Sequence, residues 1–275
     1  MENAKELSLV EKQEIMERIL AKFASFCEEH GLRYTLVGGT LLGAVRHQGF
    51  IPWDDDIDVG MPRPDYERFI ELSKSGFDGL DVLVGDYDRD LTVPFIKIED
   101  RNTRIEHDDI IYEGEGDALW IDVMPYDGLG NDRQKAIELM DVSLKYQTYL
   151  GRSASVPFKR RKEETGVKGW LRCLFRFGFH LAGHERFKQK LISLGKEHDY
   201  DSSDYVACFV SGRYGRGEVL EKSHFDLENR MSFCGHMYRA MACYDEYLSG
   251  IYGDYMKLPP EEKRVSPHLS HAYMV

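Results

Sequence analysis

The chain has 275 residues, of which 42% are hydrophobic, and a formal net charge of -12. This length allows one substantial hydrophobic core and is short for two full domains. The acidic balance argues against general binding of DNA or RNA, because such binding depends on lysine and arginine that replace the counterions of the phosphates. We therefore expect no nucleic-acid partner, and an anionic substrate would need a metal ion.

The cysteines and the hydropathy of the chain bear on its compartment. Five cysteines are present, an odd number, and no two of them form a CxxC pair. This pattern fits neither a disulfide framework nor a zinc cluster. The first ten residues lack the basic and apolar segments of a signal peptide, and no run of about 18 apolar residues occurs. We expect a cytoplasmic protein with reduced thiols.

The first elements in chain order are a helix, a strand and a second helix. Apolar residues recur at helical spacing over residues 15–27, and Gly31 supplies a stop signal. Residues 33–37 are β-branched and aromatic, which favours a strand. The pair Gly38-Gly39 follows at once, with Thr40 as a candidate N-cap. The segment therefore predicts a strand, a tight turn and a helix.

The remaining pattern predicts a sheet followed by helices. Residues 56–59 (DIDV) alternate acids with aliphatic residues, the period of a strand that shows its acids on one face. The other expected elements are a helix at 65–72, strands at 81–84, 94–98 and 118–123, and helices at 137–150, 168–194 and 244–252. This order predicts an α+β fold with a mixed β-sheet core, flanking helices and a helical C-terminal part.

Three short motifs suggest an active site: Gly38-Gly39-Thr40, then Asp56 and Asp58, then Asp122. Side chains two apart in a strand point the same way, so Asp56 and Asp58 can hold one divalent cation. Asp122 on a neighbouring strand can complete a second site. A single acidic strand face is usually solvated, and a single Gly-Gly pair is usually a turn. Their occurrence together, in this order, favours a metal-dependent active site.

Such a site suits phosphoryl transfer. Two Mg²⁺ ions roughly 4 Å apart, or Mn²⁺ in their place, would clamp the attacking and leaving oxygens of an in-line displacement. Asp122 would either accept the proton of the incoming hydroxyl or coordinate it as an alkoxide, and the residues leave both roles open. The loop of Gly38, Gly39 and Thr40 would let phosphate approach the backbone at a helix N-terminus, where free N–H groups favour an anion.

A longer motif resembles a known family. Residues 34–69, YTLVGGTLLGAVRHQGFIPWDDDIDVGMPRPDYERF, resemble the signature of the LicD family, the bacterial phosphocholine transferases related to animal fukutin and fukutin-related protein. The segments KIEDRNTR at 97–104 and YGDYMKLPPEEKR at 252–264 agree with it. The resemblance covers residues 10–270 approximately, and its central motif is long enough to be specific.

The resemblance implies a nucleotidyltransferase-like fold and a CDP-linked donor such as CDP-choline. A hydroxyl of a cell-surface glycan, a lipid-linked glycan or a teichoic-acid precursor would attack the phosphorus that bears choline, with CMP as product. Relatives use CDP-ribitol or CDP-glycerol. By motif position Asp56 and Asp58 would be metal ligands, joined by Asp54, while Asp122 aligns by order and context. Residues 1–130 would form the catalytic core, and 131–275 a mostly helical part on the acceptor side of one compact unit.

Positive charge is needed opposite a diphosphate, and three residues are candidates to supply it: Arg46, Lys97 and Arg104. For Lys97 the alternative is a charge on the solvent face of a strand, and for Arg46 it is a structural salt bridge. His47 is interpreted as a surface or supporting residue and not as a catalytic base.

A quaternary ammonium is recognised by aromatic faces. Trp53, Tyr112 and Trp120 flank the acidic motifs and are candidates for such a cage, with Trp53 the first choice. The alternative for each is a core aromatic beside the sheet.

Residues 152–190 form a basic and aromatic segment within an acidic chain. They contain eleven lysine or arginine residues against three glutamates. Such a segment could make peripheral contact with the inner face of a membrane, where anionic lipids attract basic residues and aromatic rings enter the interface. The alternative is a loop and a helix that packs on the core through its aromatics.

Two other functions compete with phosphocholine transfer. A nucleotidyltransferase would keep the nucleotide on its acceptor and release pyrophosphate, where the transferase releases CMP. A noncatalytic glycan-binding protein could retain the fold, but three unpaired carboxylates close together repel one another and are hard to explain without a cation.

Overall fold

The computed structural model describes residues 5–107, 116–155, 166–266 and 270–275. The N-terminal half contains α1 (Leu9–His30), β1 (Thr35–Leu36), α2 (Gly38–His47), β2 (Asp58–Pro62), α3 (Arg63–Ser73), β3 (Leu80–Val84), β4 (Ile96–Asp100), β5 (Thr103–His107) and β6 (Trp120–Gly128). The C-terminal half contains α4 (Arg133–Ser153), α5 (Gly166–Ala182), α6 (His184–Gly195), β7 (Tyr205–Ala207), η1 (Gly215–Glu218), β8 (Leu220–Glu221), α7 (Lys222–Phe225), β9 (Glu228–Phe233), β10 (His236–Met241), α8 (Tyr244–Tyr252), η2 (Glu261–Lys263) and β11 (Ser270–Met274).

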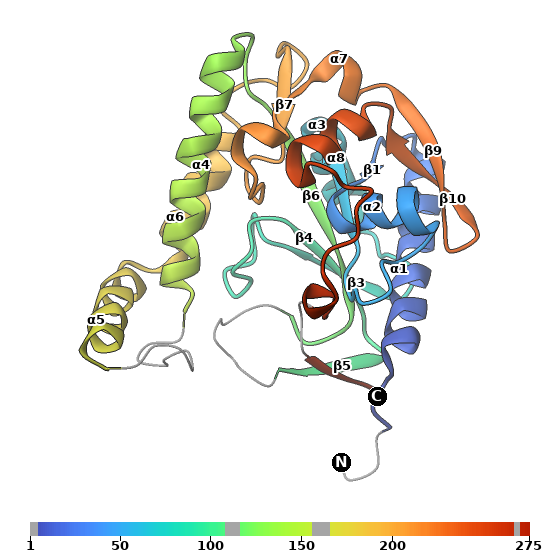
Figure 1. Ribbon diagram of the computed structural model, residues 1–275, viewed down its shortest axis with the longest axis horizontal. Helices are drawn as coiled ribbons and strands as arrows, with labels where there is room; N and C mark the ends of the chain where they lie inside the picture. Colours follow the sequence, from blue (N-terminus) through green and yellow to red (C-terminus); the bar gives the residue numbers. More distant parts are fainter. Residues whose placement is uncertain (1–4, 108–115, 156–165, 267–269) are drawn as a thin grey trace.

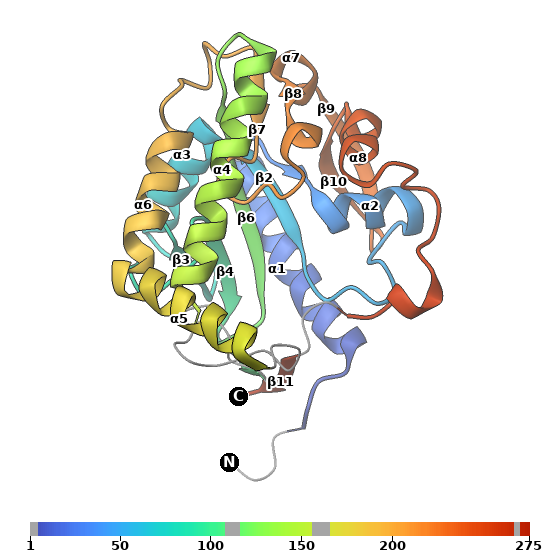
Figure 2. The same cartoon turned by 60° about the vertical axis from the view of Figure 1, so that its left-hand side comes forward.

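A mixed nine-stranded sheet forms the centre of the fold (Figures 1 and 2). Its main path runs β3-β4-β6-β2-β1-β10-β9, and β7 and β8 extend it from the far end of β6. The β2–β6 and β1–β10 pairs are parallel, while β4–β6 and β1–β2 are antiparallel. Strand β11 pairs with β5 in a separate ribbon. The predicted α+β class with a mixed sheet and flanking helices is therefore confirmed.

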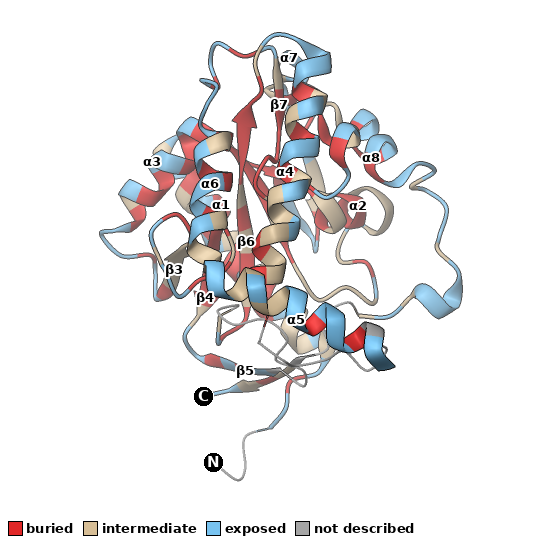
Figure 3. Ribbon diagram, turned by 90° about the vertical axis from the view of Figure 1, so that its left-hand side faces the viewer, coloured by how far each residue is buried: buried red, intermediate tan, exposed pale blue. Residues whose placement is uncertain are grey.

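Helices cover the sheet and close its core. Helix α1 begins with a capping box between Ser8 and Glu11 and ends at Gly31, which adopts the left-handed conformation with φ 62°. Its buried face joins the large apolar cluster that also contains the inner side chains of β2, β4 and β6. A smaller cluster lies between α4, α6 and β7. Figure 3 shows the buried sheet behind helices whose outer faces are exposed.

The structure corrects several expected boundaries. Strand β2 begins at Asp58, so Asp56 precedes the strand that was expected to contain it. Helix α2 begins at Gly38 with Val37 as its N-cap, so Thr40 lies inside the helix. The helix expected at 168–194 is two helices, because Gly183 between them takes φ 77°, a conformation that breaks the helical path.

The C-terminal half contains more sheet than its sequence indicates. Strands β9 and β10 form a hairpin, and β10 pairs in parallel with β1. The main sheet is therefore built from both halves of the chain. Within the ranges described above, every helix is too short or too polar to cross a lipid bilayer.

Candidate active site

Three adjacent strands bring two acids and a lysine into one row. Asp58 on β2 is the register partner of Asp122 on β6, and Asp122 is in turn the register partner of Lys97 on β4. Residues in register on neighbouring strands point to the same face of a sheet. The ammonium of Lys97 donates to Oδ1 of Asp122 at 3.0 Å and lies 3.8 Å from the centre of the Trp120 ring. The predicted meeting of residues 58 and 122 on neighbouring strands is present.

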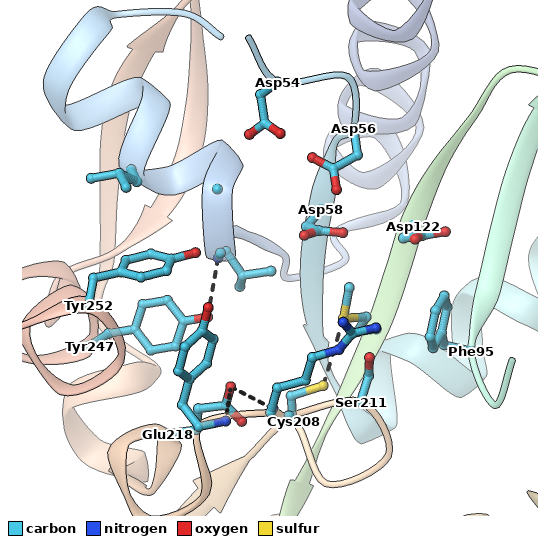
Figure 4. A pocket seen from close by; sticks show the side chains of 18 of the residues that line it. Asp54, Asp56, Asp58, Phe95, Asp122, Cys208, Ser211, Glu218, Tyr247 and Tyr252 are labelled. Carbon is cyan, nitrogen blue, oxygen red and sulfur yellow. Dashed lines mark hydrogen bonds between the residues drawn. The ribbon is translucent and has the colours of Figure 1, made fainter. Parts of the chain in front are cut away.

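Two further acids reach the same place from the segment before β2. Asp54 and Asp56 lie between α2 and β2, and their carboxylates stand beside that of Asp58 at the mouth of the row (Figure 4). All four aspartates line one cleft of about 880 Å³. This volume suits a ligand of the size of a nucleotide-linked small molecule.

The charges of these acids oppose one another. Burial raises the pKa of Asp58 well above its ordinary value, and the nearby Asp56, Asp122 and Asp54 raise it further. The positive charge of Lys97 acts in the other direction. A group of like charges at one site gains stability when a cation enters. The electrostatics therefore favour a cationic ligand at this point of the cleft.

The donor set can be compared with the needs of Mg²⁺. Among the residues that the structure describes, no three His, Cys, Asp or Glu side chains are gathered closely enough to enclose a metal ion. Mg²⁺ in phosphoryl-transfer sites takes only one or two carboxylates and completes its shell with water and substrate phosphates. Carboxylate oxygens are the ligands that it prefers. The aspartates therefore fit an ion that is bound together with a diphosphate.

The start of α2 lies directly against the acids. A Cβ atom on Gly38 would stand 3.1 Å from Oδ2 of Asp58, and one on Gly39 would stand 2.8 Å from Oδ2 of Asp54. Gly38 also has φ 54°, which disfavours other residues. Thr40 is buried, and its hydroxyl accepts a hydrogen bond from the backbone N–H of Asp58 at 2.8 Å. Thr40 thus fixes the acidic strand and does not line the cleft.

The opposite wall of the cleft is aromatic, and this wall was not predicted from the sequence. It contains Tyr214, Tyr247 and Tyr252, and the rings of Tyr214 and Tyr252 meet edge to face at 5.5 Å. The hydroxyl of Tyr247 accepts from the backbone N–H of Gly38, which connects this wall to α2 (Figure 4).

A buried carboxylate lies behind these rings. Glu218 is 5% exposed, and its Oε1 accepts from the backbone N–H groups of Arg213 and Tyr214. Its Oε2 has no hydrogen-bond partner among the described residues. Burial raises the pKa of Glu218 to about 7, against the effect of the two N–H donors. The wall therefore combines aromatic faces with an acid that a nearby cation would stabilise in its ionised form.

Comparison with known proteins agrees with this geometry. Residues 31–158 match the family model described as LicD/FKTN/FKRP, nucleotidyltransferase domain. The chain is 32% identical to the lipopolysaccharide cholinephosphotransferase LicD of Haemophilus influenzae, over 98% of this chain and 100% of that protein. The chain belongs to the LicD family. A stretch of 34 residues is also 59% identical to the human ribitol 5-phosphate transferase FKRP, and covers 12% of this chain and 7% of that protein. A stretch of 44 residues is 48% identical to the uncharacterised protein RT0683 of Rickettsia typhi, over 16% and 14% of the two chains.

The structure places one of the three candidate cations of this LicD-family chain at the cleft and the other two away from it. Arg46 lines the cleft, and its guanidinium donates to the carbonyl of Tyr255 and to His47. Neither Lys97, which is 3% exposed, nor Arg104, which lies on the exposed side of β5, is among the described residues that line it.

Two basic residues that were not predicted as site residues also line the cleft. They are Arg213 and Lys257, and both side chains are exposed. Arg213 has no ion pair with any of the described residues. Lys257 lies in the segment 252–264 that agrees with the LicD resemblance, but neither residue was assigned a role, because both lie in loops outside the helices and strands.

The aromatic predictions for this LicD-family chain had mixed outcomes. Trp53 lines the cleft, with the guanidinium of Arg264 at 5.8 Å from its ring. Trp120 is half-buried beneath Lys97 and is not among the described lining residues. Tyr112 lies outside the described residues.

Proposed function

We propose that this chain transfers phosphocholine from CDP-choline to a hydroxyl of a cell-surface glycan, such as a lipopolysaccharide or teichoic-acid precursor, and releases CMP. The observation that carries the proposal is the similarity over nearly the whole chain to a protein named for lipopolysaccharide cholinephosphotransfer. The four aspartates that line one cleft opposite an aromatic wall support it.

Asp56, Asp58 and Asp122 would hold Mg²⁺, or Mn²⁺ in its place, with Asp54 beside them. The ion would neutralise the negative charge of the diphosphate and polarise the phosphorus under attack. The carboxylates fit this ion because they are hard oxygen ligands that are crowded and partly buried. A thermal-shift titration with Mg²⁺ tests this assignment independently of turnover.

The chain's own residues would then position the donor. Gly38 and Gly39 allow the diphosphate to approach the N-terminus of α2, where backbone N–H groups and the helix dipole favour an anion. Arg46, Arg213 and Lys257 line the same cleft and supply positive charge.

The acceptor hydroxyl would attack the phosphorus that bears choline, and the bond from this phosphorus to the CMP oxygen would break. Asp122 is placed to receive the hydroxyl proton or to hold the oxygen that results. Lys97 pairs with Oδ1 of Asp122 at 3.0 Å and keeps this carboxylate in position. Because the acceptor hydroxyl would displace CMP from the phosphorus directly, the reaction needs no covalent enzyme intermediate.

The aromatic wall would recognise the choline group. A quaternary ammonium has no hydrogen to donate, so it is bound by ring faces and by a nearby negative charge. Tyr214, Tyr247 and Tyr252 supply rings, and Glu218 supplies a carboxylate behind them. Trp53 lines the same cleft as a further ring.

Two alternatives use the same aspartates. Transfer of ribitol phosphate or glycerol phosphate from a CDP donor is favoured by the short but close match to FKRP. A nucleotidyltransferase would attach the nucleotide to its acceptor and release pyrophosphate. The aromatic wall favours choline over either alditol, since an alditol offers hydroxyls and no positive charge.

The test is product analysis with three donors. The chain is incubated with Mg²⁺, a glycan acceptor, and CDP-choline, CDP-ribitol or CDP-glycerol, and the acceptor is weighed by mass spectrometry. We expect phosphocholine on the acceptor and an equal amount of CMP. Pyrophosphate with a nucleotide on the acceptor, or preference for an alditol donor, would overturn the proposal.

All five cysteines are free thiols, in keeping with the cytoplasmic location that we propose for this reaction.

A further inference from the structure

Helix α5 turns an apolar face to the solvent. Exposed apolar side chains recur along it at Val167, Trp170, Leu171, Leu174, Phe175 and Leu181. Their spacing of three, four and seven residues places them on one side of a helix. The expectation that this segment packs on the core through its aromatics is therefore only half correct, because one side packs on other helices while the side chains named here stay mostly exposed.

The packed side of α5 rests on α4 and α6. Cys173 is buried, and the Phe179 ring meets those of Tyr149 and Phe187 at 5.2 and 5.9 Å. Figures 1 and 3 show α5 at the edge of the molecule, beyond the α4–α6 pair and away from the central sheet. On the opposite side of the helix, the six apolar side chains named above are each at least 55% exposed.

The charge of α5 indicates the kind of partner. The helix contains three lysine or arginine residues and no acidic residue, in a chain of net charge -12. Arg172 is exposed at the border of the apolar face, and Arg152 of α4 lies over the rings of Phe175 and Phe179 at 5.4 and 5.6 Å. A helix with an apolar face and a basic border is suited to lie in the interface of an anionic bilayer. We propose that α5 docks this protein on anionic membranes.

The position of α5 relates this surface to the cleft. Leu150, Gly151 and Ala154 at the end of α4 line the cleft, and Arg152 between them packs on α5. Docking through α5 would bring this rim of the cleft close to the lipid surface, where an acceptor carried on a lipid would be presented. The docking itself does not depend on the proposed transfer reaction, since it needs no substrate. Residues 159–162, the most basic part of the segment noted above, lie outside the described residues.

The test is flotation of the whole chain with vesicles of phosphatidylcholine, with and without phosphatidylglycerol, at low and high salt. Leu171→Glu with Leu174→Glu removes the centre of the apolar face. The matched control is Val10→Glu with Leu227→Glu. The two pairs add the same charge at equally exposed positions, 61% and 56% in the first pair against 61% and 58% in the second.

We expect the wild type and the control to float with anionic vesicles, and the α5 double variant to lose binding by about tenfold or more. Arg172→Gln should weaken binding to anionic vesicles alone. The emission of Trp170 should shift to the blue on binding, and Trp170→Phe should abolish this shift. Equal flotation of the two double variants would overturn the proposal. So would a wild-type dimer that binds no vesicles and dissociates in the α5 double variant, because α5 would then be a protein interface.

Discussion

Asp58 and Asp122 are register partners on the parallel strands β2 and β6, and this pairing sets two carboxylates side by side in the lining of the cleft. The hydroxyl of Thr40 fixes the backbone of the first acid, and the ammonium of Lys97 fixes the side chain of the second. The pair is therefore held from both sides by the fold.

Replacement of Asp58 should stabilise the protein in the absence of a divalent cation. Asp58→Asn removes one negative charge from a crowded group of four and keeps the size of the side chain, so like-charge repulsion falls. Thermal unfolding in a chelator should show a higher melting temperature for the variant. Mg²⁺ should then raise the melting temperature of the wild type and leave that of the variant almost unchanged. A variant that is less stable in chelator and still responds to Mg²⁺ would contradict the assignment.

Lys97→Met should damage both stability and turnover. The lysine is almost fully buried against Asp122, so its loss leaves a carboxylate without its partner and should cost about 3 kcal/mol in the free energy of unfolding. If Lys97 positions Asp122, kcat should fall much more than KM for the donor rises, and Lys97→Arg should recover part of it. Lys257→Met is the comparison, because Lys257 lines the cleft and should mainly raise KM. A rise in KM alone for Lys97→Met would instead indicate direct contact with the donor.

Glu218 should make stability depend on pH. Burial raises its pKa to about 7 in the folded chain from an ordinary value of 4.5, so the folded state keeps a proton that the unfolded state has lost between these values. The free energy of unfolding should therefore fall as pH rises from about 4.5 to about 7, by roughly 3 kcal/mol from this group. Glu218→Gln should remove this dependence, so its stability relative to the wild type should increase over that window. Denaturant unfolding at several pH values measures the free energy of unfolding of both proteins. A difference between these free energies that does not change with pH would contradict the prediction.

Lys188 should hold one edge of the cleft. Its side chain is fully buried and donates to the carbonyls of Asp88 and Leu91 at 2.6 and 2.7 Å, in the loop that leads to Phe95. Lys188→Met should leave two carbonyls unsatisfied and lower the free energy of unfolding by about 2 kcal/mol or more. Lys190→Met, an exposed position on the same helix, should change it by less than about 0.5 kcal/mol. Equal effects of the two substitutions in denaturant unfolding would show that the buried contacts contribute nothing.

The sequence predicted those parts of the site that depend on local pattern. The acids of residues 56–59, the glycine pair and the third acid in an apolar strand all lie where one cleft is formed. Lys97 and Arg104 were assigned to the phosphates from their charge alone. The register of β4 with β6 instead aims Lys97 at Asp122, and Arg104 lies on β5, in the ribbon that β5 forms with β11. Register between distant segments cannot be read from spacing along the chain.

The aromatic wall could not be predicted for the same reason. Tyr214 follows β7, while Tyr247 and Tyr252 lie on α8, and only the parallel pairing of β10 with β1 brings α8 to the start of α2. Strand β1 has two residues and β10 lies some 200 residues later, so neither gives a local signal of the contact. The hairpin of β9 and β10 was missed because its residues are polar and largely exposed on one side.

The central claim is that the Asp58–Asp122 pair carries metal-dependent phosphocholine transfer, and its most direct test is CMP release from CDP-choline in the presence of a glycan acceptor. The wild type, Asp58→Asn and Asp122→Asn are compared with Mg²⁺ and with chelator. We predict CMP release by the wild type that requires Mg²⁺, and a loss on the order of a thousandfold in each variant, with the fold retained. Release by the wild type that persists in chelator, or near-normal release by either variant, would contradict the account.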